Sequence, residues 1–164
     1  IAAVILILIT IALISIIISV VLPFIQNNIS GSQCFNTIIT ISESTKYTCY
    51  KISSSEMIVQ IHFSDETSKE TISSFIIEIG GASSKGFEIF DGNTDNDGIR
   101  MYGLTSGGIP FIDSDPLEFP KNNEERTYII SHSTAPEFLR VYPKLLNGQI
   151  CDPTDSKDTV IACE

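Results

Sequence analysis

Residues 1–22 read IAAVILILITIALISIIISVVL, an apolar segment that contains no charged residue, no glycine and no proline. Its only polar residues are Thr10, Ser15 and Ser19. At about 1.5 Å per residue, a helix of this length would extend roughly 33 Å, which is enough to cross the hydrocarbon layer of a membrane. A helix that is apolar on every side has no face suited to water. The sequence therefore predicts a long hydrophobic helix that is surrounded by lipid or by other helices.

Two uses of this predicted helix are open, a single-pass membrane anchor and a helix that packs against copies of itself in a filament. Cleaved secretory signals have a shorter apolar core behind a basic flank, so we expect this segment to be retained. Small residues at Ala12, Ser15 and Ser19 would let neighbouring helices approach closely, which makes them candidates for packing in a helix bundle. Pro23 follows the segment and predicts a kink or the end of the helix.

The chain after the apolar segment has the composition of a linker and then of a folded head. We predict a hydrophobic assembly or transmembrane helix over residues 1–25, a polar linker over 26–33, and a head over 34–164. Asn28 begins an Asn-Ile-Ser sequence that fits the pattern for N-glycosylation, so it is a candidate glycan site.

Strand patterns dominate the head. Residues 57–63 alternate apolar and polar side chains, which is typical of a half-buried strand with His62 on its outer face. Residues 35–41 and 47–52 flank a polar turn and predict a hairpin. The expected fold class is therefore α+β, a long N-terminal hydrophobic helix followed by an all-β, sandwich-like head. Further strands are expected at 75–79, 87–90, 99–104, 128–130 and 138–142, with a possible last strand at 159–163.

The charge balance narrows the possible partners. Lys and Arg number 10 and Asp and Glu number 20, which gives a net charge of −10 that lies entirely after Ser42. Binding of nucleic acid through phosphate contacts is disfavoured, because no basic patch is available to replace counterions. Acidic heads would stay soluble and repel one another when loosely placed.

Four cysteines, Cys34, Cys49, Cys151 and Cys163, lie in the head without a Cys-x-x-Cys pair. Zinc sites need closer paired spacings, so we interpret the cysteines as two disulfides formed in an oxidising or extracellular compartment. The spacing permits more than one pairing. The pairing that we favour is local, Cys34 with Cys49 and Cys151 with Cys163.

One loop carries a pattern suited to a hard cation. Oxygen-bearing side chains recur at alternate positions, Asp91, Asn93, Asp95 and Asp97, as they do in calcium-binding loops. The sequence is not an EF-hand, because that motif needs glycine and glutamate at its sixth and twelfth positions. We therefore expect no cofactor with the exception of a possible calcium ion at these four residues; the alternative is an acidic connection between strands.

Catalysis has little support in the sequence. The chain contains no Gly-x-Ser-x-Gly elbow, no zinc-protease motif, no phosphate-binding loop and no dinucleotide fingerprint. The disulfide interpretation uses all four cysteines, so none is left as a nucleophile. We expect no catalytic residues and no enzymatic activity.

The run IAAVILILITIALISIIISVV at residues 1–21 resembles the mature amino-terminal segment of archaeal type IV pilins, whose class III signal peptides are removed by a dedicated peptidase. Bacterial pilins usually have Glu at the fifth position, where this chain has Ile5, and archaellins begin with a glycine-rich run that is absent here. Within the head, residues 47–50, 124–128 and 151–153 are also similar to small pilin-like surface proteins of archaea.

The resemblance implies a structural subunit of an extracellular, helical, pilus-like filament that serves adhesion or surface contact. Subunits would be inserted in the cell membrane before assembly and would then be extracted, with a secretion ATPase and a platform protein as partners. Bundled helices would form the filament core and the β heads would face outward. The alternatives are a single-pass membrane-anchored ectodomain that binds a ligand or cell surface, and a minor pilin at a filament tip.

Overall fold

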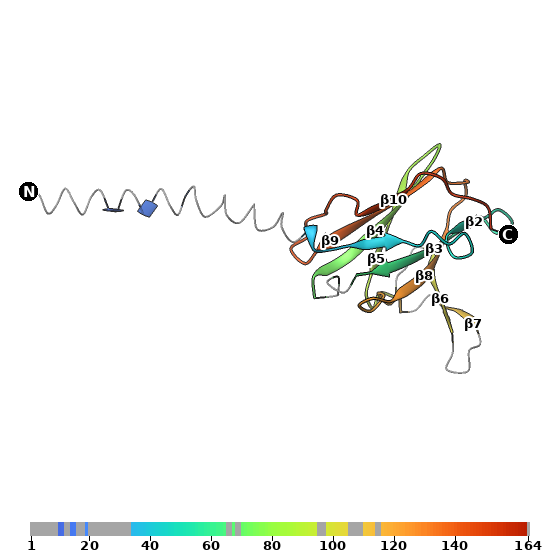
Figure 1. The fold of residues 1–164 in the computed structure, drawn as a ribbon, viewed down its shortest axis with the longest axis horizontal. Coiled ribbons are helices and arrows are strands. Elements are labelled where there is room, and N and C mark those ends of the chain that lie inside the picture. The colour runs from blue at the N-terminus through green and yellow to red at the C-terminus, as the bar shows by residue number, and fades with distance from the viewer. Residues whose placement is uncertain are drawn as a thin grey trace, which may run out of the picture. The chain divides into compact units, whose positions relative to one another are not determined.

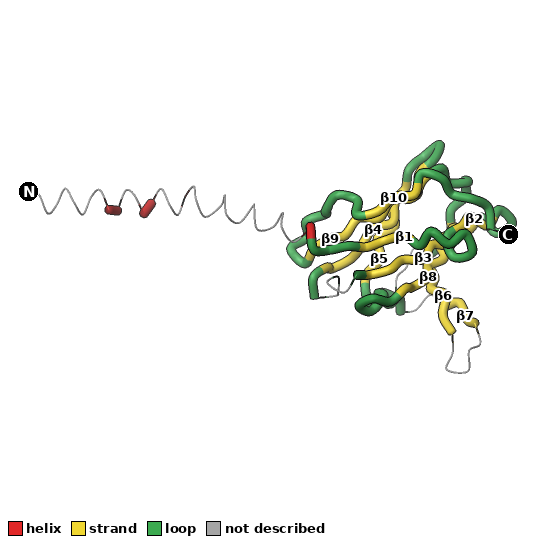
Figure 2. The backbone as a smooth tube through the Cα atoms, in the orientation of Figure 1, coloured by secondary structure: helices red, strands yellow, loops and turns green. Residues whose placement is uncertain are grey.

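The computed structural model describes residues 10, 11, 14, 15, 19, 34–64, 67, 70–94, 98–104, 110–113 and 116–163. The chain divides into two units, residues 1–35 and residues 36–164, and the described strands all belong to the second (Figures 1 and 2). These strands are β1 (Ile39–Ile41), β2 (Cys49–Lys51), β3 (Glu56–Phe63), β4 (Ile72–Gly80), β5 (Lys85–Phe90), β6 (Ile99–Leu104), β7 (Pro110–Asp113), β8 (Glu125–Ser131), β9 (Phe138–Leu145) and β10 (Asp155–Lys157).

The strands form two antiparallel sheets. One sheet has six strands in the order β1-β3-β8-β6-β7, with β2 also paired to β3, and the other has four strands in the order β10-β9-β4-β5. Strands β3 and β9 alternate buried and partly exposed residues along their whole length. This alternation turns one face of each sheet towards a shared apolar core, so the head is a β-sandwich.

An aromatic cluster joins the two sheets at the centre of this core. Phe75 of β4 lies 5.6 Å from Phe63 of β3 and 5.6 Å from Tyr128 of β8, measured between ring centroids. Phe119, in the segment before β8, lies 5.4 Å from Phe75 and 5.6 Å from Phe63. Phe63, Phe75 and Tyr128 are each 0% exposed. The cluster therefore ties the segment around Phe119 to both sheets.

The C-terminal segment lies along the edge of β1 and β2 that does not pair with β3. Asp155 accepts a hydrogen bond from the backbone N–H of Ile41 at 2.7 Å, and Thr154 donates one to the carbonyl of Ile39 at 2.8 Å. Further along, the backbone of Tyr50 in β2 exchanges hydrogen bonds with Ile161 and Cys163 at 2.9 and 3.0 Å. Backbone groups that an edge strand would leave open are thus paired. Strands β5 and β7 stand at the ends of the two sheet orders.

The predicted α+β class is wrong, because the described residues are all-β. No helix among them is long and apolar enough to cross a membrane. The helix was expected from apolar length and hydropathy, whereas every element that the structure describes is a strand. Helical backbone occurs among the described residues at Thr10, Ile11, Ile14, Ser15, Ser19, Cys34 and Phe35, which form no helical element.

The predicted hairpin is also wrong. Strands β1 and β2 do not pair with each other; both pair with β3, where Ile39 lies opposite Phe63 and Cys49 lies opposite Ile58. β3 is long enough for the two short strands to lie one after the other along the same edge. Two further short strands were not expected, β7 within a proline-containing connection and β10 in the polar sequence after Cys151. The possible strand at 159–163 is reduced to a bridge between Tyr50 and Ala162.

Candidate functional site

The first three residues of the predicted cation loop form hydrogen bonds with the segment before β8. Asp91 follows β5 directly, and its Oδ1 atom accepts a hydrogen bond from the backbone N–H of Phe119 at 2.9 Å. Gly92, with φ of +74°, donates its N–H to the carbonyl of Leu117 at 2.7 Å, and the carbonyl of Asn93 accepts from the N–H of Leu117 at 3.0 Å. Glycine suits this position because it adopts a positive φ without steric cost. The loop thus pairs with residues 117–119.

Of the four predicted calcium ligands, the structure describes Asp91 and Asn93. Asp95 and Asp97 lie outside the described residues. Among the described residues, no group of three or more His, Cys, Asp or Glu side chains is placed to hold a metal ion. The Asp91 carboxylate accepts a backbone N–H and so satisfies a loop donor.

A cleft of about 500 Å³ opens beside Asp91. Its volume is within the range of small-molecule sites in proteins. The described side chains around it carry both signs of charge and include no histidine or cysteine, so the cleft offers hydrogen-bonding and ionic groups. The lining residues are Glu70, Asp91, Glu118, Phe119, Pro120, Lys121, Asn122 and Arg126.

Residues of β8 hold Glu118, which lines the cleft, in place. The hydroxyl of Tyr128 donates a hydrogen bond to the carbonyl of Glu118 at 2.7 Å, and Arg126 forms an ion pair of 2.9 Å with the Glu118 carboxylate. Burial raises the pKa of the Tyr128 phenol far above its usual value, so the hydroxyl keeps its proton and remains a donor. The wall is therefore pre-formed, which lowers the ordering cost of binding a ligand.

Replacing Asp91 with alanine is expected to loosen this wall. The substitution removes the acceptor of the Phe119 N–H, and we expect the free energy of unfolding to fall by about 0.5–1.5 kcal/mol. Amide hydrogen exchange should show a clear loss of protection at Phe119. Asp91→Asn keeps an oxygen acceptor and serves as the control; unchanged protection at Phe119 in Asp91→Ala would contradict the role given to this carboxylate.

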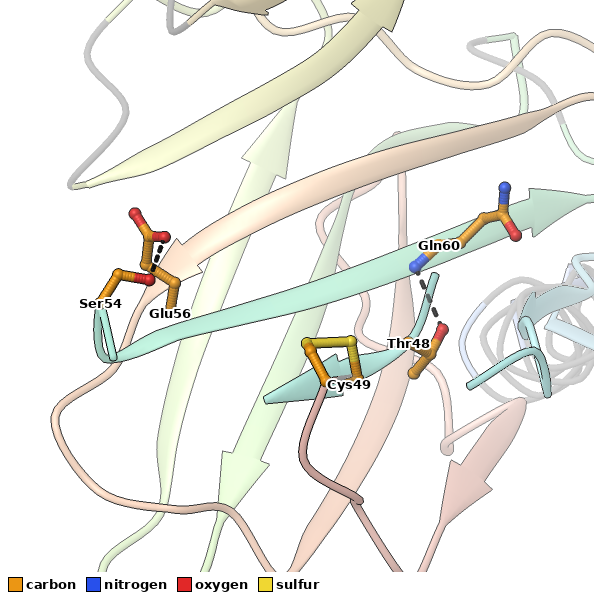
Figure 3. Close-up of a disulfide and its surroundings, with 6 residues drawn as sticks. Thr48, Cys49, Ser54, Glu56 and Gln60 are labelled. Atoms are coloured by element: carbon orange, nitrogen blue, oxygen red, sulfur yellow. Dashed lines mark hydrogen bonds between the residues drawn. A yellow bond between two sulfur atoms is a disulfide. The ribbon is translucent and has the colours of Figure 1, made fainter. Parts of the chain in front are cut away.

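All four cysteines are in disulfides, as predicted, and no cysteine is free. The favoured pairing is wrong, because Cys49 is bonded to Cys163 across a sequence separation of 114 residues (Figure 3). This bond fixes the C-terminal segment beside β2, where Thr48 accepts a hydrogen bond from the N–H of Gln60 at 3.3 Å. Sequence spacing favoured the local pairing, whereas the fold brings the two distant segments together.

The two histidines have structural surroundings. His62 lies on the outer side of β3, as expected, with Nε2 3.2 Å from the amide oxygen of Asn123. His132, which the sequence did not single out, is 9% exposed, and its ring meets Phe87 edge-on at 6.2 Å. Burial, with a smaller effect of Lys85, lowers the pKa of His132. Neither side chain is among those that line the cleft.

Among the other predicted sites, Ala12, Pro23 and Asn28 lie outside the described residues, as does the linker at 26–33. Ser15 donates its hydroxyl to the carbonyl of Ile11 at 2.9 Å, and Ser19 donates to the carbonyl of Ser15 at 2.7 Å. Each hydroxyl therefore finds a backbone partner four residues earlier, which allows a serine to lie in apolar surroundings.

Comparison of the chain with family models, with curated proteins and with solved structures found no match.

Proposed function

We propose that this protein is a structural subunit of an extracellular filament of the archaeal type IV pilus kind, in which the β-sandwich is the outward head. In this proposal the apolar segment 1–22 packs against the same segment of neighbouring subunits. The filament serves adhesion or contact with surfaces.

The observation that carries the proposal is that an apolar segment without charge is followed by an acidic β-sandwich that is cross-linked by disulfides. The described head has no free thiol, and Cys49 and Cys163 tie its C-terminal segment to β2. Disulfides persist in oxidising compartments such as the cell exterior, which supports a head that works outside the cell. All of the net charge of −10 follows Ser42, which suits a hydrated head and a dry apolar segment.

The cleft beside Asp91 supports a contact role. Its wall is held by hydrogen bonds from Tyr128 and Phe119 and by the ion pair of Arg126 with Glu118. Such a pre-formed polar cleft on a rigid sandwich is suited to holding a ligand at a cell surface.

Replacing Ser15 with lysine is expected to abolish filament assembly. A charge placed within an apolar region costs about 2.5–3.5 kcal/mol even on the scale of membrane insertion, and every subunit would bring one. Electron microscopy of secreted material measures the result: the unmodified chain should give helical filaments, and the Ser15→Lys chain should give none.

The matched control is Ser53→Lys, the same chemical change at an exposed residue of the turn before β3, which should leave filaments intact. Normal filament yield from Ser15→Lys would contradict the packing of segment 1–22 between subunits. If the unmodified chain is found only as dispersed membrane-bound particles, the membrane-anchored ectodomain is the correct interpretation and the proposal fails.

A further inference from the structure

The outer face of the four-stranded sheet is an ordered surface of aromatic and charged side chains. It is formed by residues of β4, β5 and β9 that alternate with the buried core positions of those strands. Glu78 lies opposite Arg140, and Ile76 lies opposite both Tyr142 and Glu88. Tyrosine, phenylalanine and arginine are enriched in protein interfaces, and tyrosine and arginine often carry much of the binding energy there.

Hydrogen bonds hold the acidic side chains of this face in place. Glu78 accepts from the hydroxyl of Tyr142 at 2.6 Å and from Ser84 at 2.5 Å. These bonds, that of Ser84 first, lower the pKa of Glu78, so the carboxylate is charged at neutral pH.

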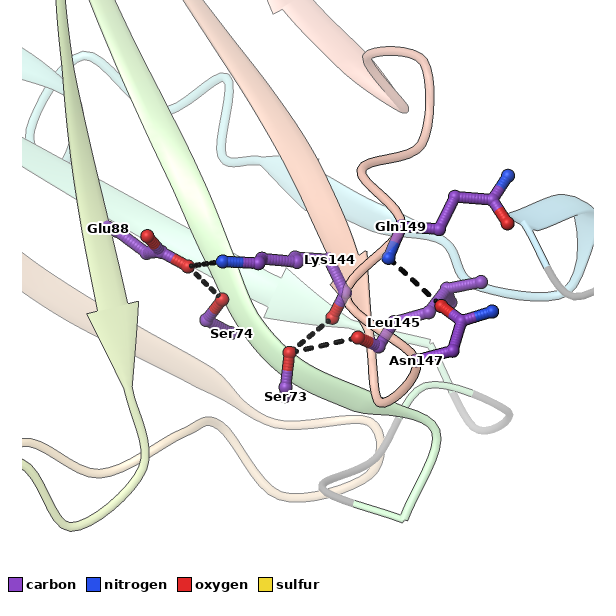
Figure 4. A network of polar contacts seen from close by, with 7 residues as sticks. All are labelled: Ser73, Ser74, Glu88, Lys144, Leu145, Asn147 and Gln149. Carbon is purple, nitrogen blue, oxygen red and sulfur yellow. Dashed lines mark hydrogen bonds and ion pairs between the residues drawn. The ribbon is translucent and has the colours of Figure 1, made fainter. Parts of the chain in front are cut away.

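A second network of polar contacts joins the three strands (Figure 4). Glu88 accepts from Ser74 at 2.5 Å and from the ammonium group of Lys144 at 2.9 Å. On the other side of Ser74, Ser73 donates to the carbonyls of Lys144 and Leu145 at 3.2 and 3.0 Å. The long side chains of this face are thus already held in place, which lowers the entropy cost of ordering them when a partner binds.

The aromatic part of the face lies flat on the sheet. Phe138 of β9 is opposite Gly80 of β4, and its ring occupies the space next to Gly80, where an added Cβ would lie 1.9 Å from the ring. Arg140 stacks over this ring with its Cζ 4.5 Å from the centroid. The glycine therefore permits an aromatic platform with a cation on top of it.

The charges of the face are divided between its two halves. Both basic residues, Arg140 and Lys144, belong to β9, and both acidic residues, Glu78 and Glu88, belong to β4 and β5. These four charges cancel, so the net charge of −10 lies entirely on the rest of the chain. Two copies of such an acidic protein can meet through this face without bringing net like charge together.

We propose that the outer face of the four-stranded sheet binds the same face of a second copy of this chain. A two-fold axis parallel to the strands places β9 of one copy over β4 and β5 of the other, so that the basic half of each face meets the acidic half of its partner. The contact is isologous: one patch on both copies, with each charge pair formed twice. This pairing goes beyond the proposed filament packing, because it joins heads and does not involve segment 1–22.

The test uses the full chain, placed at one copy per lipid nanodisc so that apolar segments of different copies do not meet. Discs with unlabelled chain are mixed with discs carrying ¹⁵N-labelled chain and treated with a zero-length carbodiimide, which joins carboxylates to amines. Mass spectrometry should find peptides that link Lys144 of one isotope to Glu78 or Glu88 of the other. Absence of such mixed cross-links would overturn the inference, even if the face were found to bind a saccharide or another protein instead.

Charge-reversal variants test whether the pairing depends on the charges of this face. Arg140→Glu alone and Glu78→Arg alone should each lower the yield of mixed cross-links about tenfold or more, and a mixture of the two variants should recover it. The matched control is Arg100→Glu, the same charge reversal at the partner of Glu56 on the six-stranded sheet, and it should leave the yield unchanged.

Thermal unfolding of each variant confirms that it is folded, and the neutral Arg140→Gln replaces Arg140→Glu if the latter is not. Equal losses from Arg100→Glu and Arg140→Glu, or no recovery in the mixture, would overturn the inference. Filament formation by electron microscopy is scored separately. Filaments without mixed cross-links would refute head pairing alone, and mixed cross-links without filaments would refute the proposed filament alone.

Discussion

Replacement of Phe75 with alanine is expected to lower the free energy of unfolding by about 3–5 kcal/mol, because it empties the centre of the aromatic cluster. Phe75 is 0% exposed and contacts Phe63, Phe119 and Tyr128. The substitution removes buried apolar area and leaves a cavity between two sheets that cannot collapse freely. Denaturant unfolding followed by circular dichroism measures the loss.

The matched control for this prediction is Phe90→Ala. Phe90 is the last residue of β5 and is 38% exposed, so its truncation leaves no closed cavity and should cost far less. Similar losses for the two substitutions would show that the cluster is not the centre of stability. The segment at Phe119 should also lose hydrogen-exchange protection in Phe75→Ala, since the two rings are 5.4 Å apart.

Removal of the Cys49–Cys163 disulfide by replacing both cysteines with serine is expected to cost about 2–5 kcal/mol. The bond closes a loop with a sequence separation of 114 residues, and long loops lose the most freedom when the unfolded chain is cross-linked. Equilibrium unfolding of the double variant, compared with the parent chain under non-reducing conditions, measures the effect.

The same variant should show a local effect as well. The C-terminal segment pairs with β2 through hydrogen bonds of the Tyr50 backbone with Ile161 and Cys163. Without the disulfide, this segment should become sensitive to proteases and the Tyr50 amide should exchange faster. If the transition midpoint and the exchange rates both stay at their parent values, the bond contributes neither stability nor edge protection.

The strands with strict alternation could be predicted from the sequence, and their pairing could not. Residues 57–63 and 138–142 alternate because one side of each strand is buried, and the structure contains β3 and β9 at these places. The α+β class is wrong because the described elements are all strands, whereas the helix was expected from apolar length and hydropathy alone. The hairpin failed because a turn-like sequence between β1 and β2 does not show that a longer strand, β3, takes both as partners.

The site could be predicted only in part, for related reasons. Asp91 was identified from oxygen spacing, but its partner Phe119 is distant in sequence, so its role as a backbone acceptor was not visible. The pairing of Cys49 with Cys163 depends on the path of the C-terminal segment along β2. The outer face of β9 could have been predicted from its alternation. Leu139 and Val141 are buried, so Arg140 and Tyr142 must lie on the opposite, outer face.

The disulfide between Cys49 and Cys163 has a mechanical consequence for a protein that is pulled by its ends. Because the bond joins β2 to the C-terminal segment, tension applied along the chain passes through the two sulfur atoms and bypasses the polypeptide between them. Strands β3 to β10 lie within this bypassed loop. Stretching therefore cannot extend the residues between Cys49 and Cys163 while this bond holds, and most of the sandwich would keep its length under a load that extends an unlinked domain.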